Sequence, residues 1–325
     1  MAGKPETLYQ KIVDTHTVKR IDDSTILLYV DIHFANEYTS PQAFAGLVER
    51  GIGVLSPDSH LCVVDHVIPT EDVTPRVIED SASARQAAKL GENCRQFGIK
   101  AFYGPNDPHQ GIEHVLMDEQ GLVRPGMVVI CGDSHTTTHG SLGALAFGTS
   151  EIEHILATQT LVYRMAKTML IRIDGHLPEG VTAKDLALAV LRKISARGAL
   201  GCVVEYQGSV VNELPVEGRM TLCNLTVEAG ARGAIIAPDE KTVEWVTAHC
   251  PDLKGEELKA AQDYWRSLKS DDDAHFDIVH TLDASALEPM VTWGTSPDQA
   301  VGISESVPEA DSFADPDSHT AAVRA

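Results

Sequence analysis

The sequence predicts an α/β protein whose sheets are largely parallel. Short apolar runs, several of them rich in β-branched residues, alternate along the chain with segments of helical periodicity. Polar residues follow directly after some of these runs, most clearly in VVICGDSH at 128–135. Such a pattern is typical of parallel strands whose carboxyl ends open into a ligand-binding crevice. The length of 325 residues favours about two domains, and 43% hydrophobic content is enough for a large core.

Periodicity and capping residues indicate the individual elements. The helices that we expect are 7–20, 41–50, 80–97, 151–166, 182–198, 239–245 and 256–268. The strands that we expect are 26–34, 62–70, 128–131, 169–175, 202–206, 234–237 and 276–282. Ser40 before Pro41 is a helix-start signal, and Thr182 with Asp185 resembles a capping box.

The charge and cysteine content exclude several classes of protein. A net charge of -21 argues against nucleic-acid or anionic-membrane partners, because Lys and Arg supply that affinity. No apolar run is long enough to span a bilayer, and the N-terminus lacks the apolar core of a signal peptide. The cysteines stand alone and form no CxxC pair, so we expect reduced thiols in a cytoplasmic protein.

The triplet Asp133-Ser134-His135 is the strongest candidate for chemistry. A carboxylate beside an imidazole can fix its tautomer and raise its pKa, which suits the imidazole to hold or move a proton. The alternative is a turn at the strand end, in which Asp133 and Ser134 accept hydrogen bonds from backbone N–H groups.

Asp65-His66 is a second acid–imidazole pair after an apolar run. An ordinary surface pair is the alternative. Because parallel strands present their carboxyl ends on one edge, we expect this pair to lie near Asp133 and His135. Neither segment, 65–66 nor 132–135, contains the Lys or Arg that a dianionic ligand would need nearby.

His135 and His139 are four residues apart in HTTTH, but no metal site is predicted from them. The glutamate of a metalloprotease HExxH motif is missing, and the threonines with the following glycine favour a loop. The glycines at 140, 143 and 148 spell neither GxGxxG nor a phosphate-binding loop.

Three further positions are open to two interpretations each. His114 is either an active-site histidine or a satisfied core histidine. Asn224 and Glu228 could line one helical face toward a ligand, or bond to each other on an exposed face. Gln42, just inside a predicted helix start, could contact a ligand or cap its own helix.

Taken together, these motifs resemble the aconitase family. The matching segments lie in the family's order along the whole chain, and include LLYVDIHFANEYTSPQAF, VDHVIPT, QGIEHV, PGMVVICGDSHTTTHGSLGALAFG, TSEIEHILATQTL, VEGRMTLCNLTVEAGARGAIIAPDE and VTWGTSP. The resemblance implies three-layer α/β/α domains and a hydro-lyase that removes and re-adds water on a small hydroxy-dicarboxylate. It also implies a 4Fe–4S cluster in which one iron lacks a cysteine ligand.

The resemblance also implies roles for the acid–base residues. Asp65-His66 is similar to the family's pair near the leaving hydroxyl group. Asp133 and His135, with Ser134 between them, are similar to the pair that positions the water or hydroxyl.

The same resemblance assigns the remaining site residues. His114 stands in the family's G-I-x-H context, and Gln42 is similar to a glutamine that contacts substrate near the cluster. Asn224 is expected beside the cluster, and Glu228 is expected beside the iron-bound oxygen.

The chain departs from the family pattern at two places. The family's cysteine ligands lie in a third domain, in G-S-C-T-N and C-x-x-C motifs that this sequence lacks. The glycine-rich stretch after Phe147 is two residues shorter than in relatives. We expect domains at 1–168 and 169–298, then a linker or tail at 299–325 leading to an absent third domain. The expected partner is a small subunit that carries a swivel domain.

Overall fold

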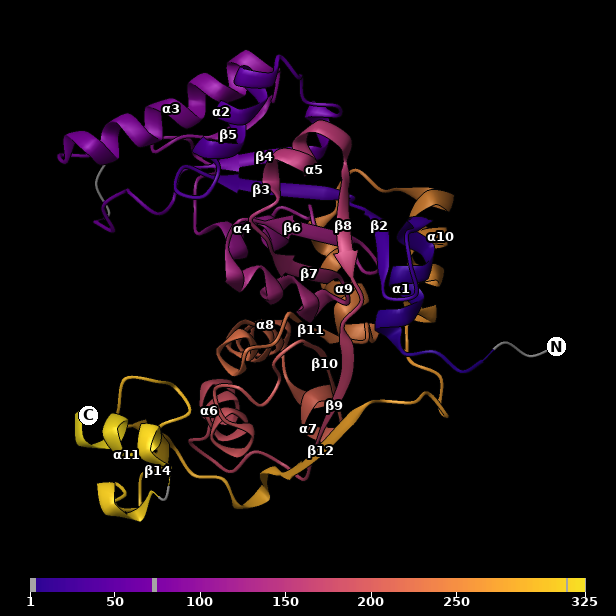
Figure 1. Ribbon diagram of the computed structural model, residues 1–325. Coiled ribbons are helices and arrows are strands. Elements are labelled where there is room, and N and C mark those ends of the chain that lie inside the picture. Colours follow the sequence, from indigo (N-terminus) through magenta and orange to yellow (C-terminus); the bar gives the residue numbers. More distant parts are fainter. Residues whose placement is uncertain (1–3, 72–74, 314, 325) are drawn as a thin grey trace.

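A five-stranded parallel sheet forms the upper half of the computed structural model, which describes residues 4–71, 75–313 and 315–324 (Figure 1). Its strand order is β5-β4-β3-β6-β7. The strands are β3 (Ile32–Asn36), β4 (His60–Val63), β5 (Ala101–Tyr103), β6 (Val128–Cys131) and β7 (Leu145–Gly148). Every neighbouring pair runs parallel, so all five carboxyl ends share one edge.

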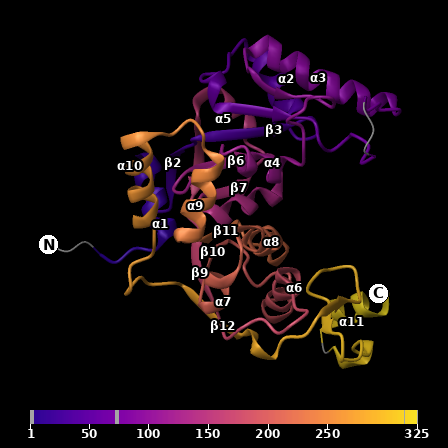
Figure 2. The same cartoon turned by 180° about the vertical axis from the view of Figure 1, so that it is seen from behind.

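Helices cover both faces of this first sheet. Side chains alternate along β4, so Leu61 and Val63 join one buried cluster and Cys62 joins another. The cluster of Cys62 packs against α2 (Pro41–Arg50), α3 (Ser81–Phe97) and α5 (Ile152–Thr158). The opposite cluster packs against α1 (Leu8–His16), α9 (Glu240–His249) and α10 (Gly255–Ser267). Helices α9 and α10 stand in front when the molecule is seen from behind (Figure 2).

A second parallel sheet has the strand order β11-β10-β9-β12. Its strands are β9 (Lys167–Asp174), β10 (Cys202–Gln207), β11 (Gly233–Ile236) and β12 (Ile278–Asp283). A third buried cluster joins this sheet to the helices α6 (Ala183–Ile194), α7 (Ser209–Glu213) and α8 (Val216–Thr226). Although α9 and α10 belong by sequence to the predicted second domain, they contribute Val243, Val246 and Trp265 to the core of the first sheet.

The 3₁₀ helix η2 (Ser134–Leu142) joins the two sheets. The Thr137 hydroxyl accepts a hydrogen bond of 2.7 Å from the Ala234 N–H of β11. A Cβ atom at Gly140 would lie 1.7 Å from the Ala234 carbonyl oxygen, so only glycine allows this close approach. The residues directly after Asp133 are thereby held against the second sheet.

The remaining elements are short. An antiparallel sheet contains β1 (Thr17–Arg20), β2 (Thr25–Tyr29) and β8 (Thr160–Arg164), and β13 (Met290–Thr292) pairs with β14 (Ala300–Gly302). Further elements are α4 (Glu113–Glu119), η1 (Pro57–Ser59), η3 (Val227–Ala229), η4 (Ala284–Ala286), η5 (Ala310–Ser312) and α11 (Pro316–Arg324). The last two lie within the predicted linker or tail.

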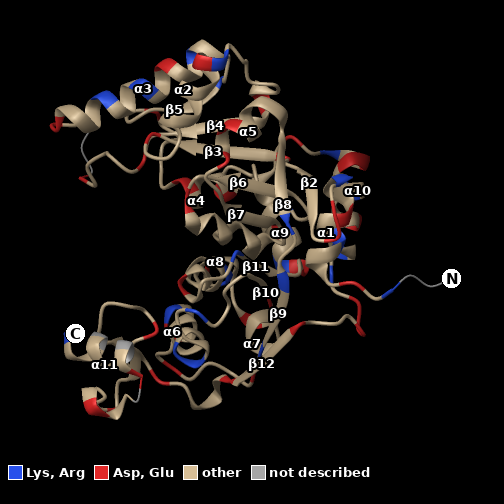
Figure 3. Ribbon diagram, viewed as in Figure 1, with Lys and Arg blue, Asp and Glu red and all other residues tan. Residues whose placement is uncertain are grey.

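The structure confirms the prediction of an α/β fold with largely parallel sheets, in layers consistent with an aconitase-like architecture. The predicted capping box at 182 is present, since the Thr182 hydroxyl accepts from the Asp185 N–H, and Asp239 caps the helix that was expected to begin there. Helix α2 begins at Pro41 as expected, but the Ser40 side chain makes no capping hydrogen bond. Acidic segments outnumber basic ones along the ribbon (Figure 3). Among the described helices, none combines the length and apolarity needed to cross a membrane.

Several predicted boundaries are wrong for identifiable reasons. The apolar run 26–34 forms two strands, because β2 pairs with β8 whereas β3 belongs to the first sheet. The predicted helix 151–166 ends at Thr158, because Gln159 adopts a left-handed conformation (φ 57°) and β8 follows. The predicted helix 7–20 likewise ends at His16, and the strand predicted at 62–70 ends at Val63. The HTTTH segment is a 3₁₀ helix and not a loop.

Candidate active site

Polar groups gather where three strands of the first sheet end. β3 leads into Glu37, β4 into Asp65-His66 and β6 into Asp133. Because these strands are parallel neighbours, their carboxyl ends lie on the same edge. His114 joins them from the first turn of α4. The convergence expected from the two acid–imidazole motifs is therefore present.

Asp133 is at the centre of this cluster and faces three imidazoles. Its Oδ1 lies 2.9 Å from His114 Nε2 and 3.6 Å from His135 Nδ1, and its Oδ2 lies 3.6 Å from His66 Nε2. Asp133 is also the N-cap of η2, and accepts the His135 N–H at 2.7 Å. The three histidines, His114 first, hold the pKa of Asp133 well below its usual range, so the carboxylate is ionised.

His66 is held as a cation that remains accessible to ligands. Its Nδ1 lies 2.5 Å from Asp65 Oδ1, and its ring stacks on Tyr38 with centroids 5.8 Å apart. The neighbouring carboxylate of Asp133, and after it that of Asp65, raises the pKa of His66 to about 11. The side chain is 31% exposed, so an imidazolium can meet a bound molecule here.

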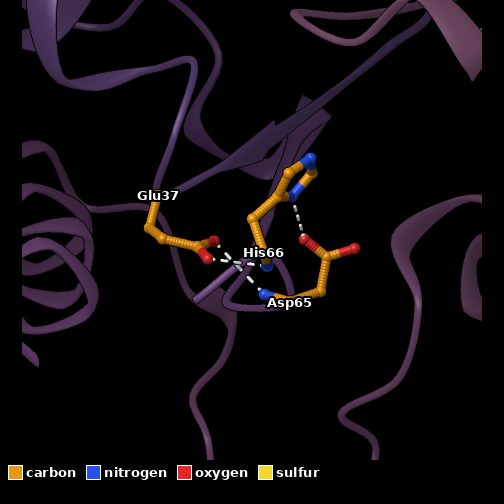
Figure 4. Close-up of side chains that lie close together, drawn as sticks. All are labelled: Glu37, Asp65 and His66. Carbon is orange, nitrogen blue, oxygen red and sulfur yellow. Dashed lines mark hydrogen bonds and ion pairs between the residues drawn. The ribbon is translucent and has the colours of Figure 1, made fainter. Parts of the chain in front are cut away.

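Glu37 shapes the turn that presents this pair. Its carboxylate accepts the backbone N–H groups of His66 at 2.7 Å, Val67 at 2.8 Å and Asp65 at 3.2 Å. Figure 4 shows this carboxylate directed at the backbone of the turn, whereas the Asp65 carboxylate faces the ring of His66. Glu37 thus positions the backbone, and Asp65 orients the imidazole.

Glu113 is a buried carboxyl group between Asp65 and Asp133. Its backbone N–H donates to Asp65 Oδ2 at 2.8 Å, and its two oxygens accept from Asn36 Nδ2 at 3.0 and 3.1 Å. Burial, followed by the nearby Asp65 charge, raises the pKa of Glu113 to about 8. This carboxyl group therefore holds a proton at neutral pH, and its Oε1 is 3.4 Å from His114 Nε2.

The two other histidines around Asp133 carry different charges. Burial lowers the pKa of His114, so this ring is neutral and donates its Nε2–H to Asp133. Asp133 raises the pKa of His135, whose Nε2 lies 3.4 Å from Glu228 Oε1. His66 therefore places positive charge on an edge whose two motifs contain no Lys or Arg, and the raised pKa of His135 favours its cationic form.

Asn224 and Glu228 both face η2 from the second sheet's helical layer. Asn224 Nδ2 donates to Thr138 Oγ1 at 2.9 Å, while Glu228 reaches His135. α8 ends at Thr226 and Glu228 lies in η3, so the two are not on one continuous α-helix. Glu228 joins the acid–base cluster directly, and Asn224 anchors α8 beside it.

Gln42 and Ser134 lie at the margin of the cluster. Gln42 is exposed on α2 and lines a cavity of about 660 Å³ together with Gly132. Within the described residues its side chain makes no hydrogen bond to the acid–base groups. Ser134 is exposed, with its Oγ 3.3 Å from His135 Nδ1. A Cβ atom at Gly148 would lie 2.4 Å from the Asp133 carbonyl oxygen, so the segment that begins at Gly148 runs directly against the Asp133 turn.

His139 points away from His135 and into the core. It is fully buried, and its Nδ1 lies 2.7 Å from Asp118 Oδ1. In a 3₁₀ helix with three residues per turn, positions i and i+4 diverge by about 120°, so the two histidines cannot share a face. The ring nitrogens of His135 and His139 therefore do not converge on one point. The sequence had predicted no metal site from this pair.

Two groups in the described part of the chain offer three potential metal-ligand atoms within 4.8 Å of one another. They are Glu37 with Asp65 and His66, and His66 with Glu113 and Asp133. In both groups, atoms are already committed to hydrogen bonds and ion pairs, and His66 is protonated. We therefore describe both groups by these hydrogen bonds and ion pairs, through which the carboxylates and His66 hold one another in place.

The cysteines are buried in the hydrophobic cores, and one of them, Cys131, donates its Sγ–H to Glu113 Oε1 at 3.6 Å. All six are buried, and they divide in pairs among three hydrophobic clusters: Cys62 and Cys94, Cys131 and Cys250, and Cys202 and Cys223. Burial raises the pKa of the Cys131, Cys202, Cys223 and Cys250 thiols, which favours the uncharged form over the thiolate that binds iron.

Sequence reasoning missed Glu37, Glu113 and Tyr38 as parts of the site. Glu113 directly precedes His114, so adjacency to a predicted site residue was an available signal for it. Glu37 follows the apolar run 26–34 only after Ala35 and Asn36. Their burial and partners depend on neighbouring strands, which no local pattern specifies.

A parallel α/β fold that surrounds one carboxylate with three imidazoles at its strand ends defines a protein with an acid–base site. The family model of the aconitase family (aconitate hydratase) matches residues 10–325. The chain belongs to the aconitase family. Membership suggests a hydro-lyase function, and the family typically binds a 4Fe–4S cluster.

Proposed function

We propose that this chain is the large subunit of a 3-isopropylmalate dehydratase. That hydro-lyase interconverts 2-isopropylmalate and 3-isopropylmalate through dehydration and rehydration in leucine biosynthesis. The observation that carries the proposal is the convergence of His66, His114 and His135 on Asp133. The ordered sequence motifs support this substrate over other members of the family.

The proposed chemistry assigns proton donation to His66. In dehydration, the C–O bond breaks with its electron pair on oxygen, and a proton from His66 completes water. The C–H electrons form the new double bond, and that proton passes to a base outside this chain. Asp65 and Asp133 hold the imidazolium in place, and His135 with Glu228 orients the leaving or incoming water.

Charge on the site edge supports a dicarboxylate substrate. The whole chain carries a net charge of -21, which repels a dianion. The His66 imidazolium opposes that repulsion at the strand ends, and the raised pKa of His135 favours the same charge there. Glu113 is uncharged at neutral pH, so it adds no further negative charge beside the substrate.

The cysteines do not fit a cluster-binding set, because they are buried in three separate cores. We therefore derive no step through a cluster, and propose that its thiolate ligands come from polypeptide outside these residues. A third domain and a small subunit would complete the site. After anaerobic reconstitution, the isolated chain should bind no 4Fe–4S cluster, and a stoichiometric cluster absorbance would contradict this proposal.

Substrate assays test the function itself. ¹⁵N-histidine-labelled protein is titrated with 2-isopropylmalate, citramalate, homocitrate and 2,3-dimethylmalate while the His66 and His135 resonances are followed. The completed assembly is then assayed for isomerisation of each acid. We expect the largest resonance shifts and turnover with 2-isopropylmalate, and a strongly reduced turnover with Asp133→Asn.

Each other outcome has a distinct meaning. Preference for another acid changes the substrate to that of a related hydratase. Binding without turnover in the completed assembly favours a non-catalytic remnant of the family. No perturbation and no turnover with any acid overturns the hydro-lyase proposal.

A further inference from the structure

Behind the acid–base cluster lies a second carboxylate–imidazole pair. Asp118 and His139 are both 0% exposed, and Asp118 Oδ1 lies 2.7 Å from His139 Nδ1. A carboxylate oxygen can only accept, so His139 Nδ1 carries the shared proton. The chemistry proposed above uses neither residue, because neither reaches the strand-end surface.

This pair connects the two elements that carry the His114–Asp133 hydrogen bond. α4 holds His114 and, one helical turn later, Asp118. η2 begins at its N-cap Asp133 and contains His139. The Asp118–His139 contact therefore joins α4 to η2 on the inner side, and the 2.9 Å His114–Asp133 contact joins them on the outer side.

His139 also packs directly on the ring of His114. The ring centroids are 5.6 Å apart at an interplanar angle of 67°, which is an edge-to-face contact. The other side of His139 contacts Phe34 in the same manner, at 5.5 Å and 62°. His114 Nδ1 is buried and has no hydrogen-bond partner among the described residues. Its orientation thus depends on the Asp133 bond and on the His139 ring.

Energetics argue against a purely stabilising role for the pair. His139 Nε2 and Asp118 Oδ2 are buried without partners in the described structure. Each orphaned polar atom costs about 1–3 kcal/mol, and apolar side chains of similar volume often replace buried polar pairs without loss of stability. Asp118 and His139 lower the stability of the fold and yet contact the active-site residue His114. This combination points to a role in holding His114 in place.

We propose that Asp118 and His139 are positioning residues, which hold His114 as its Nε2–H tautomer directed at Asp133. This inference rests on the proposed hydration chemistry for its purpose. Its structural content does not depend on turnover. Asp118 fixes His139 through the short hydrogen bond, His139 fixes the plane of His114, and His114 donates to Asp133.

The test follows the His114 ring by ¹⁵N NMR of histidine-labelled full-length chain. The His114 signals are assigned as those lost in His114→Gln. Asp118→Asn keeps an acceptor for His139, so it should preserve the wild-type Nε2–H pattern. The double variant Asp118→Leu/His139→Phe keeps apolar volume but removes the hydrogen bond, and should lose the single-tautomer pattern of His114.

A matched control separates positioning from general damage. His16 makes a comparable 2.8 Å contact with Asp31 away from the site, so His16→Phe should leave the His114 signals unchanged. Urea unfolding of every variant measures stability alongside. In a completed, active assembly, the double variant should lower kcat by about 10²-fold with KM nearly unchanged.

Wild-type His114 signals in a folded double variant would overturn the proposal. If the double variant does not fold, the single variant His139→Phe is measured instead. Its His114 ¹⁵N NMR signals then decide whether the proposal holds. Loss of the tautomer pattern without any turnover in the wild-type assembly would support the positioning role while the proposed function fails. The two failures are therefore distinguishable.

Discussion

The two parallel sheets end in similar polar residues but use them differently. Carboxylates stand at strand ends in both sheets, and the second sheet has Asp174 as the last residue of β9 and Asp239 after β11. Asp174 accepts the Ser209 N–H, while Asp239 caps α9 and pairs with Arg219. These two carboxylates therefore hold the first residues of α7 and α9 in place, and Asp239 also neutralises the buried Arg219. On the first sheet, Asp133 also caps a helix, yet it faces three imidazoles.

This difference shows that a carboxylate at a parallel strand end does not by itself make a site. Asp133 and Asp239 both satisfy backbone N–H groups. Among the residues that the structure describes, the first sheet brings together two imidazoles whose pKa values are shifted in opposite directions. His66 is charged, and His114 is neutral. Groups with pKa values displaced in opposite directions are what acid–base chemistry requires.

The largest expected effect comes from Asp133→Asn. Loss of this charge removes the main cause of the raised His66 pKa, so that pKa should fall from about 11 toward its ordinary value. Turnover in the completed assembly should fall by about 10²–10⁴-fold, the usual range for general acid–base catalysis. NMR titration of His66 and steady-state kinetics measure the two effects.

Asp174→Asn provides the matched control on the second sheet, because Asn still accepts the Ser209 N–H. Its turnover should equal that of the wild type. An equal loss in both variants would remove the distinction between the two strand-end edges.

Glu113→Gln and Glu205→Gln should separate pH-dependent stability from catalysis. The folded-state pKa of Glu113 is raised to about 8 from 4.5 by burial, so its stabilising contribution is fully present below about 4.5 and lost as pH rises through 8. Glu113→Gln should therefore gain stability relative to the wild type, on the order of 5 kcal/mol, as pH rises across this interval. Urea unfolding at several pH values measures the gain.

Burial also raises the pKa of Glu205 on β10, so Glu205→Gln should gain stability with the same sign. Only Glu113→Gln should change the pH profile of turnover, because Glu205 contacts Ser270 and Gln207, far from Asp133 in the fold. A changed pH profile in Glu205→Gln would contradict that assignment.

The smallest structural effect is expected from Gln42→Ala. Its exposed side chain bonds to none of the acid–base groups, so the free energy of unfolding should change by less than about 0.5 kcal/mol. Titration of the completed assembly with 2-isopropylmalate should nonetheless show weaker binding, if Gln42 contacts substrate from its cavity. Ala45→Ser, one turn along the exposed side of α2, serves as the control. Unchanged binding in Gln42→Ala would remove this residue from the proposed site.

Local patterns predicted most of the first sheet and the two acid–imidazole pairs. Apolar runs followed by Asp65-His66 and Asp133-Ser134-His135 indicated strand ends, and parallel topology implied that the ends meet. The break within 26–34 could not be predicted, because both halves are apolar. Their separation depends on which neighbouring strands offer hydrogen bonds.

The sequence by itself determined the parallel α/β class, the helix caps at 182 and 239, and the chemical types present at the strand ends. Tertiary structure alone decided the charge of each histidine, since burial and neighbouring carboxylates set the pKa values of His66 and His114. It also turned His139 inward, because η2 is a 3₁₀ helix pressed against β11. Periodicity records which face a residue takes within its own element, whereas proton affinity depends on groups that the chain brings together from distant positions.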